Sequence, residues 1–159
     1  MLSLVETLTN TLLEKQMKLV CAESCTGGML ATIMTHRPGA SKVFERGYVT
    51  YSNESKHEVL GVSTNILKMY GAVSSECATA MAQGALEKSH ADIAISITGI
   101  AGPEGDENKP VGLVYFGYAL KNGHHGTLEQ NFAGDRTSIR EQSVTTALTC
   151  LISILEEAA

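Results

Sequence analysis

The chain has 159 residues, of which 43% are hydrophobic and 18% are charged. This length corresponds to roughly one domain, and the apolar content is enough for a buried core, which excludes an intrinsically disordered chain. Twelve lysine and arginine residues against seventeen aspartate and glutamate residues give a net charge of −5, whereas proteins that hold nucleic acid or anionic membranes are basic. We therefore expect a single domain, 1–159, that binds neither nucleic acid nor a membrane.

The N-terminal segment and the cysteines indicate the compartment. No stretch approaches the roughly 20 apolar residues that cross a bilayer, and Glu6 and Glu14 lie where a signal peptide needs an uncharged core. We expect a cytoplasmic protein. The cysteines lack the paired spacing of a zinc site and the density of a disulfide scaffold, so we expect reduced, mostly buried thiols. They are Cys21, Cys25, Cys77 and Cys150.

The first part of the chain has the pattern of a helix, a strand and a second helix. Apolar residues at spacings of three and four predict an amphipathic helix over 2–16. The short apolar run 18–22 predicts a strand, which the small residues 25–28 interrupt. A helical pattern over 29–34 follows. We therefore expect a tight turn between a strand and a helix at 25–28.

The middle of the chain continues the alternation. Aromatic and β-branched residues predict a second strand over 44–51. Capping residues then predict a helix from near Glu54, a short helix over 64–70 and a longer one over 74–88.

The last part of the chain adds a buried strand, a hairpin and a closing helix. The continuous apolar run 92–98 is typical of a strand that is covered on both faces. Two further strands, 113–120 and 126–131, flank an Asn-Gly turn and predict a hairpin. A long helix is predicted over 138–157. Together these elements predict an α/β fold, a three-layer αβα sandwich around a mixed, mostly parallel sheet.

Three loops follow predicted strands, and ligands of open α/β sheets bind beyond the carboxyl ends of the strands. The first loop is 23–28, where Ser24 lies on a sharp turn before a helix. Backbone N–H groups around Thr26, Gly27 and Gly28 would suit an oxyanion or a phosphate. The alternative is a structural turn in which Ser24 or Thr26 only caps the helix.

The second loop, 51–56, places Lys56 in the first turn of a predicted helix. A helix N-terminus favours anions, so this position would lower the pKa of the lysine and make it usable as a general base. The alternative is an ordinary solvated lysine.

The third loop is 98–103, and the segment 109–112 follows it. It either cradles an anionic group or forms an ordinary Gly-Pro turn. The candidate binding residues here are Thr98, Gly99, Ala101, Gly102 and Lys109.

Other charged and imidazole groups carry weaker signals. Arg136 and Arg140 lie one helical turn apart and could reach a phosphate, although an N-cap at Asp135 explains part of this pattern. The histidines are dispersed, so we expect neither a metal site, nor a Ser-His-Asp triad, nor a cofactor. They are His36, His57, His90, His124 and His125.

Six motifs, in this order along the chain, resemble the CinA C-terminal domain family, whose enzymatic members are nicotinamide-nucleotide amidohydrolases. They are AESCTGG at 22–28, FERGYVTYSNESK at 44–56, GAVS at 71–74, ITGIAGP at 97–103, KPVG at 109–112 and GDR at 134–136. The resemblance covers nearly the whole chain, and AESCTGG together with TYSNExK is highly specific. It implies the stand-alone form of the family.

The resemblance also implies an activity, which is deamidation of nicotinamide mononucleotide to nicotinate mononucleotide and ammonia in pyridine nucleotide salvage. By matching the motifs, Ser24 is the nucleophile, Lys56 the general base and Tyr51 an assisting hydroxyl, without metal. Lys109, Arg136 or Arg140 would hold the nucleotide phosphate. The partners expected are a small nucleotide and further copies of the chain in a homo-oligomer. The alternative is a non-catalytic nucleotide-binding or regulatory module related to competence or DNA damage.

Overall fold

The structure is a computed structural model that describes residues 1–106 and 108–157. The described part of the chain contains six α-helices, five strands and one 3-10 helix. The helices are α1 (Leu2–Lys15), α2 (Met29–Met34), α3 (Asn53–Leu60), α4 (Thr64–Met69), α5 (Ser75–Glu87) and α6 (Arg136–Glu157). The strands are β1 (Leu19–Glu23), β2 (Phe44–Val49), β3 (Ile93–Gly99), β4 (Leu113–Leu120) and β5 (His125–Asn131), and the 3-10 helix is η1 (Ala40–Lys42).

Every predicted element is present, and the differences lie at element ends. The strand predicted to reach Tyr51 ends at Val49, because the chain there turns toward the N-cap of α3. The closing helix begins two residues earlier than predicted, at Arg136, because the Asp135 carboxylate accepts from the Ser138 N–H at 2.8 Å and caps it. The sequence pattern did not predict η1.

The five strands form one mixed sheet in the order β2-β1-β3-β4-β5. β1 pairs in parallel with β2 and β3, whereas β4 is antiparallel to both β3 and β5. Four of the five strands therefore run in the same direction. The predicted mixed sheet is confirmed, and its antiparallel edge is the predicted hairpin.

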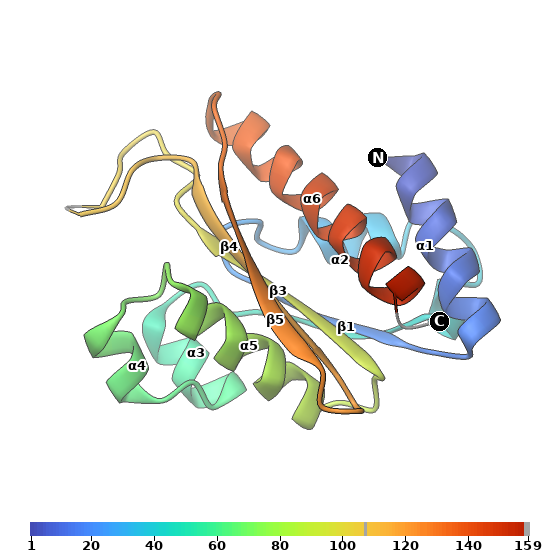
Figure 1. Ribbon diagram of the computed structural model, residues 1–159. Coiled ribbons are helices and arrows are strands. Elements are labelled where there is room, and N and C mark those ends of the chain that lie inside the picture. Colours follow the sequence, from blue (N-terminus) through green and yellow to red (C-terminus); the bar gives the residue numbers. More distant parts are fainter. Residues whose placement is uncertain (107, 158–159) are drawn as a thin grey trace.

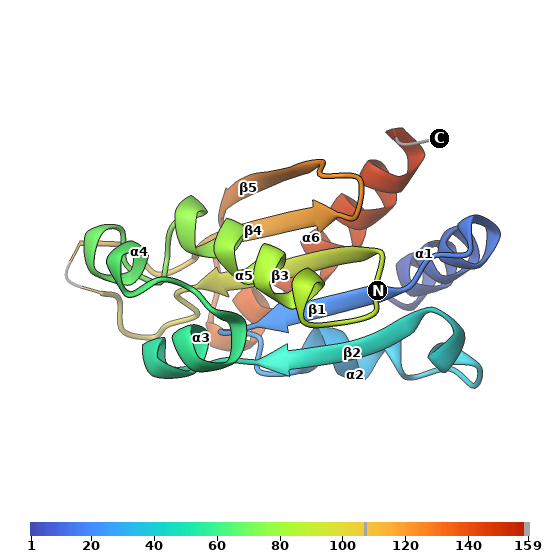
Figure 2. The same cartoon turned by 90° about the horizontal axis from the view of Figure 1, so that it is seen from below.

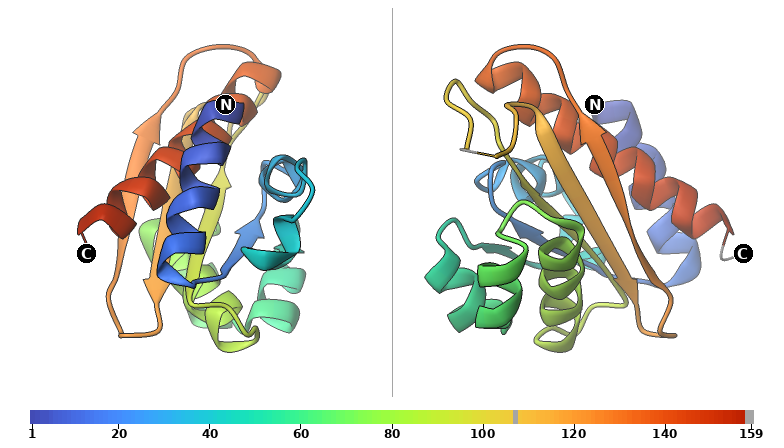
Figure 3. Two further views of the ribbon diagram at one scale, coloured as in Figure 1. Left: turned by 90° about the vertical axis from the view of Figure 1, so that its right-hand side faces the viewer. Right: turned by 60° about the vertical axis from the view of Figure 1, so that its left-hand side comes forward.

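Helices cover both faces of the sheet, so the predicted three layers are confirmed. α1, α2 and α6 lie on one face and α3, α4 and α5 on the other (Figures 1 and 3). β1 shows how the two cores arise, because its side chains alternate between the faces. Leu19 and Cys21 pack in the core beneath α1 and α6, whereas Val20 and Ala22 pack in the core beneath α5.

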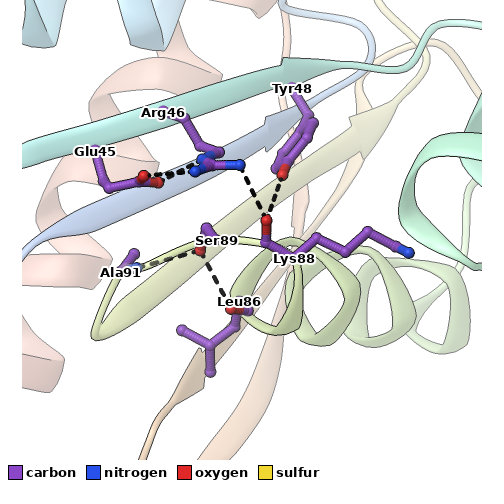
Figure 4. Close-up of polar contacts among 7 residues, drawn as sticks. All are labelled: Glu45, Arg46, Tyr48, Leu86, Lys88, Ser89 and Ala91. Atoms are coloured by element: carbon purple, nitrogen blue, oxygen red, sulfur yellow. Dashed lines mark hydrogen bonds and ion pairs between the residues drawn. The ribbon is translucent and has the colours of Figure 1, made fainter.

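The C-terminal end of α5 is fastened to the edge strand β2 (Figure 4). The carbonyl oxygen of Lys88 accepts from Arg46 Nη1 and from the Tyr48 hydroxyl, both at 3.1 Å. A guanidinium at this end is favourable because the last carbonyls of a helix carry partial negative charge. Arg46 is itself held by Glu45 at 2.6 Å. These contacts fix β2, whose carboxyl end leads into the residues around Lys56.

The carboxyl ends of the three parallel strands meet at one edge of the sheet, which Figure 2 shows from below. Two backbone hydrogen bonds continue the sheet past the strand ends. The Ser24 N–H donates to the Ile97 carbonyl at 3.0 Å, and the Thr50 N–H donates to the Glu23 carbonyl at 2.9 Å. The three loops selected from the sequence therefore lie side by side.

Candidate active site

Lys56 is the central side chain of this edge. The Ser52 hydroxyl caps α3 by accepting from the Ser55 N–H at 3.1 Å, and this start places Lys56 in the first turn of the helix. Its Nζ lies 2.9 Å from Ser24 Oγ. The same nitrogen lies 2.9 Å from the Thr50 carbonyl oxygen and 3.2 Å from that of Tyr51. Sequence reasoning paired Lys56 with Ser24, but it gave no sign of the two carbonyls.

Lys56 is buried, with 1% of its surface exposed. The solvated lysine considered from the sequence is therefore wrong. Burial lowers the pKa of its amine, because a charged ammonium loses its hydration there. The sequence predicted the direction of this pKa shift, but attributed it to the helix N-terminus. No described carboxylate forms an ion pair with Lys56 that would restore its charge.

The contacts of Lys56 accommodate its amine in both the charged and the neutral form. A neutral amine has two N–H groups and one lone pair. When the amine is charged, its three N–H groups donate to Ser24 Oγ and to the carbonyls of Thr50 and Tyr51. When it is neutral, the two carbonyls accept its two N–H groups and its lone pair faces the Ser24 hydroxyl. In its neutral form, an amine at this distance from a hydroxyl is within reach to accept its proton.

The Ser24 loop, residues 24–28, is organised by a carboxylate that sequence reasoning did not select. Glu23 is 1% exposed, and its carboxylate accepts from Thr26 Oγ1 at 2.6 Å and from the N–H groups of Leu30 and Ala31 at 2.9 and 3.1 Å. Glu23 therefore occupies the N–H groups of Leu30 and Ala31 in the first turn of α2, which are not open to a ligand. The available signal was an acidic residue at the end of the strand that leads into a helix.

The backbone N–H groups of the Ser24 loop differ in their availability. The Gly27 N–H donates to the Ser24 carbonyl at 3.0 Å, and Thr26 is fully enclosed. The N–H groups of Cys25, Thr26 and Gly28 form no hydrogen bond with the rest of residues 1–106 and 108–157. Gly27 and Gly28 have φ angles of 57° and 101°, a region that favours glycine and explains the pair.

Cys25 adjoins Ser24 and is a chemical competitor for the role of nucleophile. It is 5% exposed, and burial raises the pKa of its thiol to about 11. A cysteine acts as a nucleophile through its thiolate, so this environment leaves Cys25 a packed thiol. The expected reduced cysteines are present, and Cys21 and Cys77 are buried like Cys25.

Tyr51 and Arg136 join loops at the outer part of the site. Tyr51 is 60% exposed, and its hydroxyl oxygen accepts from Arg136 Nη2 at 3.2 Å. Arg136 Nη1 donates to the Gly102 carbonyl at 2.7 Å. The structure thus brings the second and third loops and the start of α6 together through one exposed guanidinium.

The remaining candidate cations contact backbone carbonyls. Arg140 donates from Nε to Cys25 and from Nη2 to Thr26, each at 3.1 Å. Lys109 Nζ donates to the carbonyls of Tyr70, at 3.0 Å, and Val73. Arg140 therefore touches the Ser24 loop, whereas Lys109 joins the segment 109–112 to the segment before α5.

The third loop is tightly packed against its surroundings. Thr98 Oγ1 donates to the Ala72 carbonyl at 2.9 Å, and Ala101 is 4% exposed. A Cβ on Gly99 would lie 2.7 Å from the Leu113 carbonyl oxygen, so only glycine fits. Gly102, with φ of 86°, turns its carbonyl toward Arg136. Thr98 and Ala101 thus support the loop from within.

The described residues hold neither a cluster of metal ligands nor a membrane-spanning helix. Within residues 1–106 and 108–157, no three His, Cys, Asp or Glu side chains lie close enough together to hold a metal ion. In the same residues, no helix is both long and apolar enough to span a bilayer.

The structure is an αβα sandwich in which a buried lysine contacts a serine at the carboxyl edge of the sheet. Comparison with known proteins gives the family of this chain. The model of the CinA C-terminal domain matches residues 1–155. The chain belongs to the CinA C-terminal domain family, as its motifs indicated. A CinA superfamily protein from Klebsiella pneumoniae has the same fold, with a TM-score of 0.95 and 36% identity over 98% of both chains.

Curated relatives fall into two lengths. A nicotinamide-nucleotide amidohydrolase, PncC, from Enterobacter agglomerans is 51% identical over 129 residues, which are 80% of this chain and 79% of that protein. PncC from Escherichia coli is 49% identical, with 82% and 79% covered. A relative from Caldicellulosiruptor saccharolyticus, named among competence-damage inducible proteins, is 54% identical over 94% of this chain. That match covers 36% of the relative, so this chain spans about a third of its length.

Proposed function

We propose that the protein is an amidohydrolase that converts nicotinamide mononucleotide to nicotinate mononucleotide and ammonia, as a single domain in pyridine nucleotide salvage. Similarity to two nicotinamide-nucleotide amidohydrolases over four fifths of the chain supports the substrate class. One observation carries the mechanism, which is the contact of 2.9 Å between the buried Lys56 amine and the Ser24 hydroxyl.

The first half of the reaction forms an ester. Ser24 Oγ attacks the carboxamide carbon while its proton moves to the neutral amine of Lys56. The bond from carbon to the amide nitrogen then breaks, and the Lys56 ammonium returns this proton to the leaving nitrogen, which departs as ammonia. A serine is a poor nucleophile at its own pKa, so a base within hydrogen-bond reach is required. Lys56 meets this requirement.

The second half releases the acid. Lys56 takes a proton from a water molecule that attacks the ester carbon, and it returns the proton to Ser24 Oγ as the ester bond breaks. N–H groups of the Ser24 loop would stabilise the oxyanion in both halves, and those of Cys25, Thr26 and Gly28 lack an acceptor in the described structure. The Tyr51 hydroxyl would assist at the outer rim, where Arg136 holds it.

The nucleotide phosphate would be held near the third loop. Among the three cations named from the sequence, Arg136 is the exposed one at the rim, which favours it as the phosphate ligand. Thr98, Gly99, Ala101, Gly102 and Lys109 would shape this side of the site. Assembly into a homo-oligomer and a cytoplasmic location stay predictions.

A direct assay tests the proposal. Purified protein is expected to release ammonia and nicotinate mononucleotide from nicotinamide mononucleotide in equal amounts. Ser24→Ala and Lys56→Ala are each expected to lower the rate by about 100-fold or more, because general-base catalysis contributes at least that much. Ser41→Ala and Lys42→Ala, both exposed residues of η1, are the matched controls.

The assay also separates the alternative. A non-catalytic nucleotide-binding or regulatory module would bind the nucleotide without releasing ammonia. If folded Lys56→Ala keeps more than about a tenth of the wild-type rate, the role of Lys56 as base is wrong.

A further inference from the structure

We propose that Arg140 and Glu23 are positioning residues that hold the Ser24 loop from two sides, and that Arg140 is not a ligand of the nucleotide phosphate. This inference rests on the proposed function. It gives a positioning role to two charged side chains that take no part in the proposed mechanism.

Arg140 forms hydrogen bonds with the Ser24 loop from the α6 side. Its Nε and Nη2 donate to the consecutive carbonyls of Cys25 and Thr26, each at 3.1 Å. Lys56 reaches Ser24 from α3, on the opposite face of the sheet (Figure 1). Two donors of one rigid guanidinium fix two successive peptide groups, so Arg140 restrains the backbone directly after Ser24.

The planarity of the peptide carries this restraint back to Ser24. The carbonyl of Thr26 points toward Arg140, so the N–H of the same peptide, on Gly27, points the opposite way. This N–H donates to the Ser24 carbonyl at 3.0 Å. The position of Arg140 is thereby coupled to the backbone of the nucleophile itself.

Glu23 holds the loop from within. Its buried carboxylate accepts a short hydrogen bond of 2.6 Å from Thr26 Oγ1, while the N–H groups of Leu30 and Ala31 tie it to α2. Hydrogen bonds to an ionised group are stronger than those between neutral groups. Thr26 is therefore fixed through its hydroxyl by Glu23 and through its carbonyl by Arg140.

The loop needs such a restraint because its sequence gives it little stiffness of its own. Gly27 and Gly28 have no side chains to limit their backbone angles, and the residues around them must keep Ser24 Oγ at 2.9 Å from Lys56. A displacement of about 1 Å at a reacting group can lower a rate by on the order of 100-fold. The two side chains thus act through Ser24.

A phosphate ligand and a positioning residue give different kinetics. Loss of a phosphate ligand weakens substrate binding and raises KM, whereas loss of positioning lowers kcat with little change in KM. Modification of Ser24 by a small uncharged sulfonyl fluoride needs the positioned serine but no nucleotide phosphate. Its rate therefore reports positioning alone.

The test compares Arg140→Gln, Arg140→Lys and Glu23→Gln with wild type, and Arg37→Gln is the exposed control for loss of a positive charge. Circular dichroism and thermal melting establish folding. For Arg140→Gln we expect kcat for nicotinamide mononucleotide and the sulfonylation rate of Ser24 to fall together, by on the order of 100-fold, with KM nearly unchanged. In Glu23→Gln, kcat and the sulfonylation rate of Ser24 should fall together in the same way. If Arg140→Gln does not fold, Arg140→Lys carries the same comparison.

A raised KM with an unchanged sulfonylation rate would make Arg140 the phosphate ligand and overturn the proposal. Wild-type protein that is sulfonylated on Ser24 but releases no ammonia would refute the proposed function alone, and the sulfonylation rates would still decide the role of Arg140. Wild-type protein in which Ser24 is neither sulfonylated nor active would overturn both.

Discussion

Gly84 lies in the last turn of α5, where this helix meets the end of α3. A Cβ at this position would lie 1.9 Å from the carbonyl oxygen of Leu60, the last residue of α3. Ordinary contacts begin at roughly 3.5 Å, so Gly84→Ala forces the two helices apart by about 1.5 Å. Because α3 carries Lys56, the same movement disturbs the contact with Ser24.

The magnitude follows from two opposing effects. Alanine is a better helix former than glycine by about 1 kcal/mol, but a backbone clash of this depth belongs at the upper end of overpacking costs, about 3 kcal/mol. We expect a net destabilisation of about 2 kcal/mol, which lowers Tm by roughly 4 to 8 °C in a domain of this size. The deamidation rate should fall by on the order of 100-fold, because the base is displaced by about an ångström.

Calorimetry and the ammonia assay measure the two effects on the same preparation, with the exposed neighbour Gln83→Ala as control. A Tm that rises in Gly84→Ala together with an unchanged rate would refute the reasoning. It would mean that α3 and α5 do not depend on this close approach.

Three further predictions concern the neighbourhood of Ser24. The rate of deamidation should rise with pH, with a midpoint below the ordinary lysine pKa of about 10.4. The reason is that burial lowers the pKa of Lys56, whose neutral form is the active base. A rate that does not rise with pH in this way would contradict the prediction. Cys25→Ala should keep substantial activity, measured by ammonia release, because burial raises the pKa of the Cys25 thiol to about 11. A variant that folds but is inactive would count against Ser24 as the nucleophile. Thr50→Val should raise the free energy of unfolding by about 1 to 3 kcal/mol in urea titration, since the buried Thr50 hydroxyl has no partner in the described structure. The rate should be kept, because Lys56 contacts the Thr50 carbonyl rather than its hydroxyl, and a loss of stability would refute this.

Local patterns were sufficient to predict the elements of the fold. The apolar run 92–98 and the Asn-Gly hairpin specify strands through nearest neighbours, and the structure places β3, β4 and β5 there. Ends were less predictable, because they depend on single caps. Asp135 moves the start of α6, and the capped turn after Val49 shortens β2.

Only the residues of the candidate site that belong to sequence motifs could be predicted. Ser24 and Lys56 could be named, but the depth of burial that lowers the pKa of Lys56 depends on how α3 packs on the sheet. The contacts of Glu23 and Arg140 with the Ser24 loop could not be predicted either, because Arg140 and Cys25 are more than a hundred residues apart in the sequence. Contacts with backbone carbonyls leave no pattern in side-chain types.

The most direct test of the central claim is peptide mass mapping of protein quenched with acid during turnover of nicotinamide mononucleotide. Attack by Ser24, activated by Lys56, predicts an ester on Ser24 whose mass is that of the substrate minus ammonia, absent from Ser24→Ala. The same mass on Cys25, with Ser24 unmodified, would contradict the account.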